Sequence, residues 1–209
     1  MPASQLFRKN AKSHLENFEI RRNIYKSQIN AFRSMVSEEL IGIEIGVSAG
    51  RIIRNACLEV GAEPCTEMRT LGLEGIREDY VGCATTLPFW NGTFDYAVIP
   101  ATISFVDEIE SVFAESHRIL KDEGEIMVGF IDANTEAGTN YLMNRFNRDF
   151  YLDAFLYSSD QVIELLEKTG FKSVEVYQTV FGNVEEISDV QEPQEGYGDG
   201  AFVIIKAKK

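Results

Sequence analysis

Residues 41–50 constrain the fold of this chain more than any other segment. They read Ile-Gly-Ile-Glu-Ile-Gly-Val-Ser-Ala-Gly, an apolar run that passes directly into a turn of small residues. An amphipathic segment over residues 51–58 follows at once. A buried strand that ends in small residues and opens a helix lets the backbone approach a ligand closely, with the helix amides directed at it. The segment therefore predicts a site for a nucleotide-like cofactor.

Strand and helix patterns alternate along the rest of the chain. After the opening strand and helix, strand patterns fall at 59–63, 79–81, 94–99 and 125–131, and helix patterns at 65–71, 107–120 and 160–168. Crossovers of this length join parallel strands, so we expect an α/β fold with a Rossmann-like, doubly wound sheet and helices on both faces. Residues 173–180 and 201–207 are strand patterns without a helix between them. The sheet should therefore be mostly parallel, with an antiparallel C-terminal strand.

Local signals suggest where the later helices begin and end. Asp107 is expected to cap the helix that runs to Leu120, and the polar segment 121–124 should stop that helix. Ser159 is expected to cap the next helix, which should end at Gly170.

The length of 209 residues fits a single domain with a full-sized core. Residues 1–38 carry a helical spacing and are expected to form an N-terminal helical cap. Residues 133–157 form an aromatic-rich insert that could act as a substrate lid, although a cap packing on itself is the alternative. The acidic loop 182–200 joins two strands and is not a domain linker.

Charge and composition limit the kinds of ligand, membrane association and metal site that we expect for this chain. The net charge of −13 disfavours nucleic acid and favours a neutral or cationic small molecule. No apolar run reaches the length of a membrane span and the N-terminus has no apolar export signal, so we expect no membrane association and a cytoplasmic location. The three cysteines, Cys57, Cys65 and Cys83, form no C-x-x-C pair, so we expect small apolar fillers, no metal site and no disulfide framework.

The spacing of the first turn separates two cofactor classes. A dinucleotide site needs G-x-G-x-x-G, whereas this turn has Gly46, Ser48 and Gly50, with Arg51 where the third glycine belongs. Glu63 follows at the end of the second strand, where a carboxylate can accept both ribose hydroxyls, and fits either class. The turn spacing and the antiparallel ending favour S-adenosylmethionine. The alternative is that the glycines only permit close packing of helix on strand.

Five motifs in order resemble the class I S-adenosylmethionine-dependent methyltransferases, specifically the methyltransferase type 11 kind. The similarity extends from about Phe7 to Lys208, and the tail 195–203 resembles one subgroup of that family. The motifs cover residues 44–51, 61–68, 82–89, 94–98 and 118–124.

The resemblance implies a set of cofactor-binding residues. The backbone at Gly46, Val47, Ser48 and Gly50, after Glu44, would contact the methionine and ribose portions, and Glu63 would bind the ribose diol. Around the adenine, Pro64 and Met68 would flank one face, and Ala84 and Leu87 the other, beside Cys83. Pro100 and Ala101 would lie beneath the methionine. For Met68, ordinary core packing is the alternative.

Thr85 and Thr86 stand where relatives often carry an acidic residue before Leu-Pro-Phe, and two further positions depart from the family pattern. Cys83 stands where relatives often carry an acidic residue that accepts a hydrogen bond from the adenine amino group, and a thiol accepts poorly. Ser48 replaces the middle glycine of the turn, which is tolerable if its φ is negative. Both departures suggest modest cofactor affinity.

Methyl transfer needs alignment and exclusion of water more than a catalytic side chain. His14 is the one candidate, because it falls where relatives often carry a tyrosine near the cofactor; an exposed helix histidine is the alternative. Substrate choice is expected from the N-terminal helices, residues 101–106 and the insert 133–157, with Asp132 as a polar anchor for a small amine or aromatic acceptor.

Three functions remain open at the level of sequence. The leading hypothesis is an S-adenosylmethionine-dependent methyltransferase that acts on a small molecule and releases S-adenosylhomocysteine. A non-catalytic protein that binds the same cofactor is the first alternative. An NAD-dependent oxidoreductase is the second, and the glycine spacing argues against it. The acceptor and the oligomeric state have no sequence signal.

Overall fold

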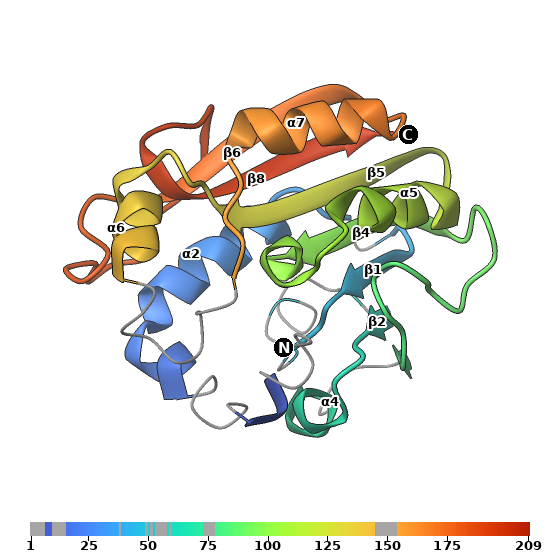
Figure 1. The fold of residues 1–209 in the computed structure, drawn as a ribbon, viewed down its shortest axis with the longest axis horizontal. Coiled ribbons are helices and arrows are strands. Elements are labelled where there is room, and N and C mark those ends of the chain that lie inside the picture. The colour runs from blue at the N-terminus through green and yellow to red at the C-terminus, as the bar shows by residue number, and fades with distance from the viewer. Residues whose placement is uncertain are drawn as a thin grey trace.

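The computed structural model describes residues 7–9, 16–37, 39–48, 50, 52, 58, 60–72, 78–144 and 154–209. Its centre is a sheet of eight strands in the order β3-β2-β1-β4-β5-β8-β6-β7 (Figure 1). The strands are β1 (Gly42–Ile45), β2 (Val60–Ala62), β3 (Glu78–Tyr80), β4 (Phe94–Pro100), β5 (Leu120–Ile131), β6 (Lys172–Phe181), β7 (Gln194–Glu195) and β8 (Gly200–Lys208).

The sheet is parallel from β3 to β5 and antiparallel beyond it. β1 pairs with β2 on one side and with β4 on the other, both in parallel. β8 pairs antiparallel with β5 along Glu125–Ile131, and β6 pairs antiparallel with β8. The expected mostly parallel, Rossmann-like sheet with an antiparallel C-terminal strand is confirmed. Strands β1 to β3 build one half of the sheet, and the chain then returns to add β4 on the other side of β1. The strand order therefore reverses between β1 and β4, and ligands bind at such a switch point in open α/β sheets.

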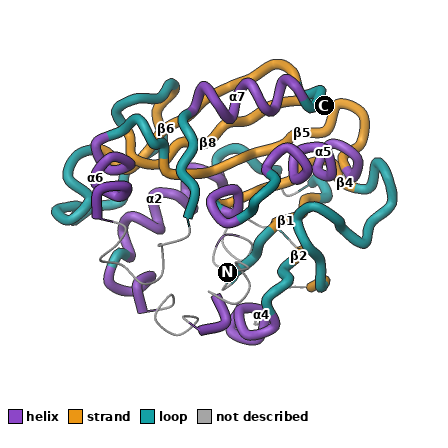
Figure 2. Tube along the Cα trace, in the orientation of Figure 1, coloured by secondary structure: helices purple, strands orange, loops and turns teal. Residues whose placement is uncertain are grey.

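Helices cover both faces of this sheet (Figure 2). The described helices are α2 (Arg22–Arg33), α4 (Thr66–Gly72), the 3-10 turn η1 (Thr102–Phe105), α5 (Ile109–Ile119), α6 (Glu136–Asn144) and α7 (Ser159–Lys168). None of them is long and apolar enough to cross a bilayer.

Alternate residues of the central strands supply the two cores. In β4, Ala97 and Ile99 belong to the core that also contains Phe113 of α5 and Leu166 of α7. On the opposite face, Val98 belongs to the core with Ala31 and Phe32 of α2. Successive side chains of a strand point to opposite faces, so a central strand buried on both faces is apolar throughout.

Both helix caps differ from the sequence prediction by one residue. Glu108, not Asp107, is the N-cap residue of α5, and its side chain makes no capping hydrogen bond. Ser158, not Ser159, caps α7: its hydroxyl accepts from Gln161 N while Gln161 Oε1 accepts from Ser158 N, a capping box. Gly170 follows α7 with a φ of +100°, as a helix-ending glycine does.

The polar segment after α5 belongs to the next strand. Residues 121–124 were expected to stop the helix, and α5 does end just before them, at Ile119, but they lie within β5, which begins at Leu120. Its start pairs with the start of β4, Phe94 to Leu120, and Asp95 forms an ion pair with Lys121 at 2.9 Å. The register with β4 then jumps to Tyr96 opposite Glu125, so residues 121–124 form a bulge within β5, with Glu123 at a φ of +63°. The two-residue β7 in the acidic loop was likewise not predicted.

Candidate functional site

A cavity of about 580 Å³ opens at the carboxyl ends of β1, β2 and β4. Its lining includes the turn after β1, the residues that follow β2 and the segment that follows β4. The volume is in the usual range for a small-molecule site, and its position is the switch point of the sheet.

Gly46 begins the turn after β1 in a conformation that favours glycine. Its φ is +83°, and its N–H donates to Ala62 O at 2.8 Å, which ties the turn to β2. A Cβ at this position would overlap the hydroxyl of Thr102, which donates to Ile45 O at 2.9 Å. Backbone conformation and steric contact therefore both require glycine here.

Ser48 corrects the sequence expectation about the middle of the turn. Its φ is +51°, so it adopts the left-handed conformation instead of the negative φ that would make serine unstrained. This conformation costs a residue with a Cβ about 1–2 kcal/mol. In it, the N–H of Ser48 donates to Glu63 Oε2 at 2.9 Å, so the strained residue holds a carboxylate from the neighbouring strand.

Glu63 follows β2 and is only 7% exposed. Its Oε1 accepts from Cys65 N at 2.8 Å and its Oε2 from Ser48 N at 2.9 Å. Burial raises the pKa of Glu63 above its ordinary value, and the two backbone N–H groups oppose that shift. Each carboxylate oxygen keeps a further acceptor position after these bonds. The carboxylate is thus fixed in orientation and still able to accept two hydroxyl groups.

Gly82, Cys83, Ala84 and Thr85 form another part of the lining. The Cys83 thiol is exposed and lies 3.4 Å from the hydroxyl of Thr85, while Ala84 is buried. The family resemblance predicts that the adenine lies near this loop. The loop contributes the methyl group of Ala84 and the thiol of Cys83 to the lining.

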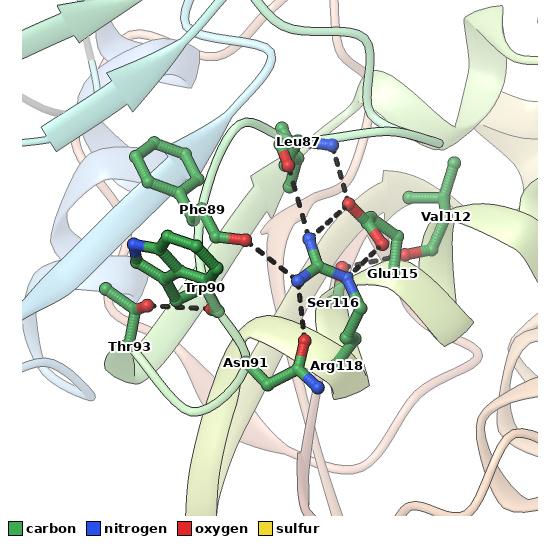
Figure 3. Close-up of polar contacts among 9 residues, drawn as sticks. All are labelled: Leu87, Phe89, Trp90, Asn91, Thr93, Val112, Glu115, Ser116 and Arg118. Atoms are coloured by element: carbon green, nitrogen blue, oxygen red, sulfur yellow. Dashed lines mark hydrogen bonds and ion pairs between the residues drawn. The ribbon is translucent and has the colours of Figure 1, made fainter.

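An arginine network holds the segment that follows this loop (Figure 3). Arg118 of α5 donates to Phe89 O at 2.8 Å and to Leu87 O at 3.2 Å. It also binds Glu115 through two nitrogens at 2.7 Å, and Glu115 accepts from Leu87 N at 2.6 Å. The Arg118 hydrogen bond is the main cause that lowers the pKa of Glu115. The 87–91 segment is thus attached to α5 both through a backbone N–H, which donates to Glu115, and through backbone carbonyls, which accept from Arg118.

The structure brings most of the predicted cofactor-binding residues to one cavity. Those in its lining are Glu44, Gly46, Val47, Ser48, Glu63, Pro64, Cys83, Ala84, Pro100 and Ala101. Gly50, Met68 and Leu87 are not among the lining residues. Met68 is completely buried beside Cys65 and Phe7, the packing alternative that the sequence left open.

Two predicted substrate or catalytic residues are not in the described lining. His14 lies outside the described residues. Asp132 is buried and fixes local structure: Oδ1 accepts from Asn134 N at 2.8 Å, and Oδ2 accepts from the hydroxyl and N–H of Ser159 at 2.5 and 3.2 Å. The expectation that Asp132 anchors an acceptor was wrong, because the first residues of α7 use its carboxylate.

Aromatic side chains supply the rest of the lining, and only their segments were anticipated. The N-terminal helices, the 101–106 segment and the 133–157 insert all contribute, as expected. Phe202 of β8 was missed, because its place beside the cavity depends on the pairing of β8 with β5. The aromatic residues of the lining are Phe7, Phe18, Tyr25, Phe32, Phe105, Tyr141 and Phe202. Phe146, Phe150 and Tyr151 of the insert lie outside the described residues.

No group of three His, Cys, Asp or Glu side chains that could hold a metal ion occurs in the part of the chain that the structure describes.

Comparisons with known proteins identify relatives of this fold and site. A family model described as a methyltransferase domain matches residues 41–128. The uncharacterized protein MJ1123 of Methanocaldococcus jannaschii is 32% identical over 204 residues, which span 98% of each chain. A crystal structure from Thermotoga maritima, described as a SAM-dependent methyltransferase and possible histamine N-methyltransferase, is 33% identical, with a TM-score of 0.94, and covers 98% of this chain and 99% of that chain.

A more distant structure shares the fold. Phosphoethanolamine N-methyltransferase 2 of Haemonchus contortus has been solved with S-adenosylhomocysteine and with S-adenosylmethionine. It is 20% identical with a TM-score of 0.58, over 80% of this chain and 48% of that chain. At this identity the likeness concerns the fold alone.

Proposed function

Since this chain belongs to the class I S-adenosylmethionine-dependent methyltransferases, we propose that it transfers a methyl group from S-adenosylmethionine to a small-molecule acceptor. The cofactor is S-adenosylmethionine, which carries the methyl group in activated form on a sulfonium. The observation that carries the proposal is the Glu63 carboxylate, held by Ser48 N and Cys65 N in the wall of the cavity.

The residues of the cavity fit this cofactor in four places. Glu63 would accept both ribose hydroxyls, because its two oxygens are fixed and keep acceptor positions free of the backbone. The turn at Gly46 lets the backbone approach the ligand without a side chain between them. Pro100 and Ala101, after β4, would lie beneath the methionine portion, and the apolar surface of Ala84 would pack on the adenine.

The protein's contribution to transfer is then alignment of the acceptor and exclusion of water from the methyl group. A cavity of about 580 Å³ whose lining includes seven aromatic residues suits a small acceptor better than a polymer chain. The Thermotoga maritima relative, described as a possible histamine N-methyltransferase, supports the same substrate size.

Calorimetric titration with S-adenosylhomocysteine tests cofactor binding. We expect the wild type to bind, and Glu63→Ala to bind about 10- to 100-fold more weakly, because two hydrogen bonds to a charged acceptor are lost. Glu164→Ala, an exposed position of α7, is the matched control and should bind as the wild type does. No binding by the wild type would refute the cofactor assignment.

A non-catalytic protein that binds the same cofactor is the second candidate. It is favoured by the thiol of Cys83 at the position where relatives often carry an acidic residue. Transfer of labelled methyl from the cofactor to members of a small-molecule library decides between the two. Labelling of any acceptor at a rate that falls with Glu63→Ala supports the enzyme, and binding without labelling supports the alternative.

A further inference from the structure

The 82–85 loop of the cavity lining lies beside Glu63, on the side away from β1. It follows β3, and β2 lies between β3 and β1 in the sheet. A Cβ on Gly82 would lie 3.8 Å from the Cβ of Ala62, the last residue of β2, and Glu63 N donates to Tyr80 O at 3.1 Å. The turn after β1 and the segment after β4 line the cavity on the opposite side of Glu63.

This order assigns the adenine of the cofactor to the 82–85 loop. The ribose is the middle part of the cofactor, with the adenine at one end and the methionine at the other. With the ribose at Glu63, as proposed above, the methionine would lie toward β1 and β4, where η1, α6 and β8 line the rest of the cavity for an acceptor. The adenine would then lie on the β3 side, against the 82–85 loop.

The loop holds two polar side chains in a fixed arrangement. Thr86 N donates to Cys83 O at 2.9 Å and closes a turn, and the next residue, Leu87, is attached to α5 by the arginine network. Within the turn, Cys83 Sγ lies 3.4 Å from Thr85 Oγ1, and either atom can donate to the other. The edge of a base at this loop therefore meets a thiol and a hydroxyl.

The 82–85 loop contains no carboxylate. The acidic residues of the described lining are Glu44 in β1, Glu63 after β2, and Asp107 and Glu108 after η1. An ionised carboxylate only accepts hydrogen bonds, so at the base it would select the 6-amino group of adenine, which donates, and repel a 6-oxo group. A hydroxyl either donates or accepts, and a thiol does both weakly, so this pair can contact either group.

We infer that Cys83, with Thr85 as its partner, sets the base selectivity of the cofactor site, and that the site does not distinguish a purine 6-amino group from a 6-oxo group. The inference rests on the function proposed above. The Thr85 hydroxyl accepts from the amino group of adenine, and by rotation it donates to the oxo group of hypoxanthine. Exchange of one hydrogen bond between uncharged groups for another changes affinity by about 10-fold or less.

Calorimetric titration with two compounds tests the inference without turnover. S-adenosylhomocysteine and S-inosylhomocysteine differ only in the purine, adenine in the first and hypoxanthine in the second. We expect the wild type to bind both, with dissociation constants within about 10-fold of each other. If neither compound binds, the proposed function is refuted and the inference with it. If S-adenosylhomocysteine binds and is preferred by more than about 10-fold, the inference alone is refuted.

Cys83→Asp and Cys83→Asn connect the selectivity to the named residue. The two variants place side chains of the same shape at an exposed position and differ in charge, and urea unfolding checks that both are folded. Cys83→Asp should tighten S-adenosylhomocysteine and weaken S-inosylhomocysteine, so that the preference for adenine rises to about 100-fold. Cys83→Asn is the control, because its amide both donates and accepts, and its preference should stay within about 10-fold. An unchanged preference in Cys83→Asp refutes the role of Cys83.

Discussion

At the scale of single residues, the turn after β1 contains three left-handed positions, Gly46, Ser48 and Gly50, and the first two hold the neighbouring strand and its carboxylate. Gly46 and Ser48 have φ values of +83° and +51°, and they are separated by one residue. Glycine adopts this conformation freely, whereas serine pays for it and gains a hydrogen bond from its N–H to Glu63. The turn therefore stores strain at the position that orients the proposed ribose-binding carboxylate.

Gly46→Ala tests the steric part of this turn against a matched glycine. Gly182 has nearly the same φ, +81°, but a Cβ there would meet nothing within 4 Å. Gly182→Ala should cost only the left-handed conformation, about 1–2 kcal/mol of unfolding free energy. Gly46→Ala should cost about 1–3 kcal/mol more, because the added methyl overlaps Thr102. Urea unfolding of both variants measures the difference, and equal losses would contradict the steric argument.

The raised pKa of Glu63 predicts a pH dependence of cofactor binding. Burial is the main cause of the shift, so protonation begins at a higher pH than for an ordinary glutamate. Ionising an acid whose pKa is raised in the folded state lowers the stability of the fold. The full stability is therefore present below the unfolded-state pKa, and it decreases as the pH rises through the folded-state pKa. Binding of ribose hydroxyls needs that charged form, so affinity should fall as the pH is lowered from neutrality through the raised pKa.

Calorimetry with S-adenosylhomocysteine between pH 7.5 and the ordinary glutamate range, about pH 4.3, checks this pH dependence. Wild-type affinity should decrease toward acid pH, whereas Glu63→Gln should bind weakly with little pH dependence. A decrease of the same size in both proteins would assign the titration to another group.

At the scale of elements, α5 is attached to the 87–91 segment by Arg118. The guanidinium serves two backbone carbonyls and Glu115, and Glu115 in turn accepts from Leu87 N (Figure 3). The 118–124 motif marks Arg118 in the sequence but does not indicate its partners. These are Leu87, Phe89 and Asn91, about 30 residues earlier in the chain.

Arg118→Met should remove this attachment. The carbonyls of Leu87 and Phe89 and the Glu115 carboxylate would lose their donor together, and we expect a loss of about 2–3 kcal/mol in unfolding free energy. Lys168→Met is the control, because it removes a cation whose ion pair with Glu110 is exposed and contributes under about 1 kcal/mol. Urea unfolding compares the two variants, and a similar small loss in both would show that the network adds little.

The order and type of the longer strands and of α4, α5 and α7 could be predicted, whereas β7, α6 and the ends of the elements could not. Residues 94–99 and 125–131 carry the apolar runs of central strands, and both are strands in the sheet. The start of β5 at Leu120 depends on its pairing with Phe94 of β4. Ser158 caps α7, whereas the hydroxyl of Ser159 donates a hydrogen bond to Asp132. Local patterns do not contain these partners.

At the scale of the whole molecule, one sheet runs through the described residues and both of its faces are covered. This continuity supports the proposal that residues 1–209 form a single domain. The switch between β1 and β4 places the turns after β1, β2 and β4 at one edge, where the cavity opens. The N-terminal helices and β8 supply further residues to the lining of this cavity.

The sequence by itself determined the fold class and the cofactor, and it singled out Glu63 as the carboxylate proposed to bind that cofactor. These depend on local periodicity, on the glycine spacing of residues 46–50 and on the distance to Glu63, all of which are properties of adjacent residues. Only the tertiary structure decided that Ser48 is left-handed, that Asp132 accepts from the first residue of α7 and that Phe202 lines the cavity. Those facts arise from contacts between segments far apart in the chain, and packing against such partners overrides the local preference of each residue.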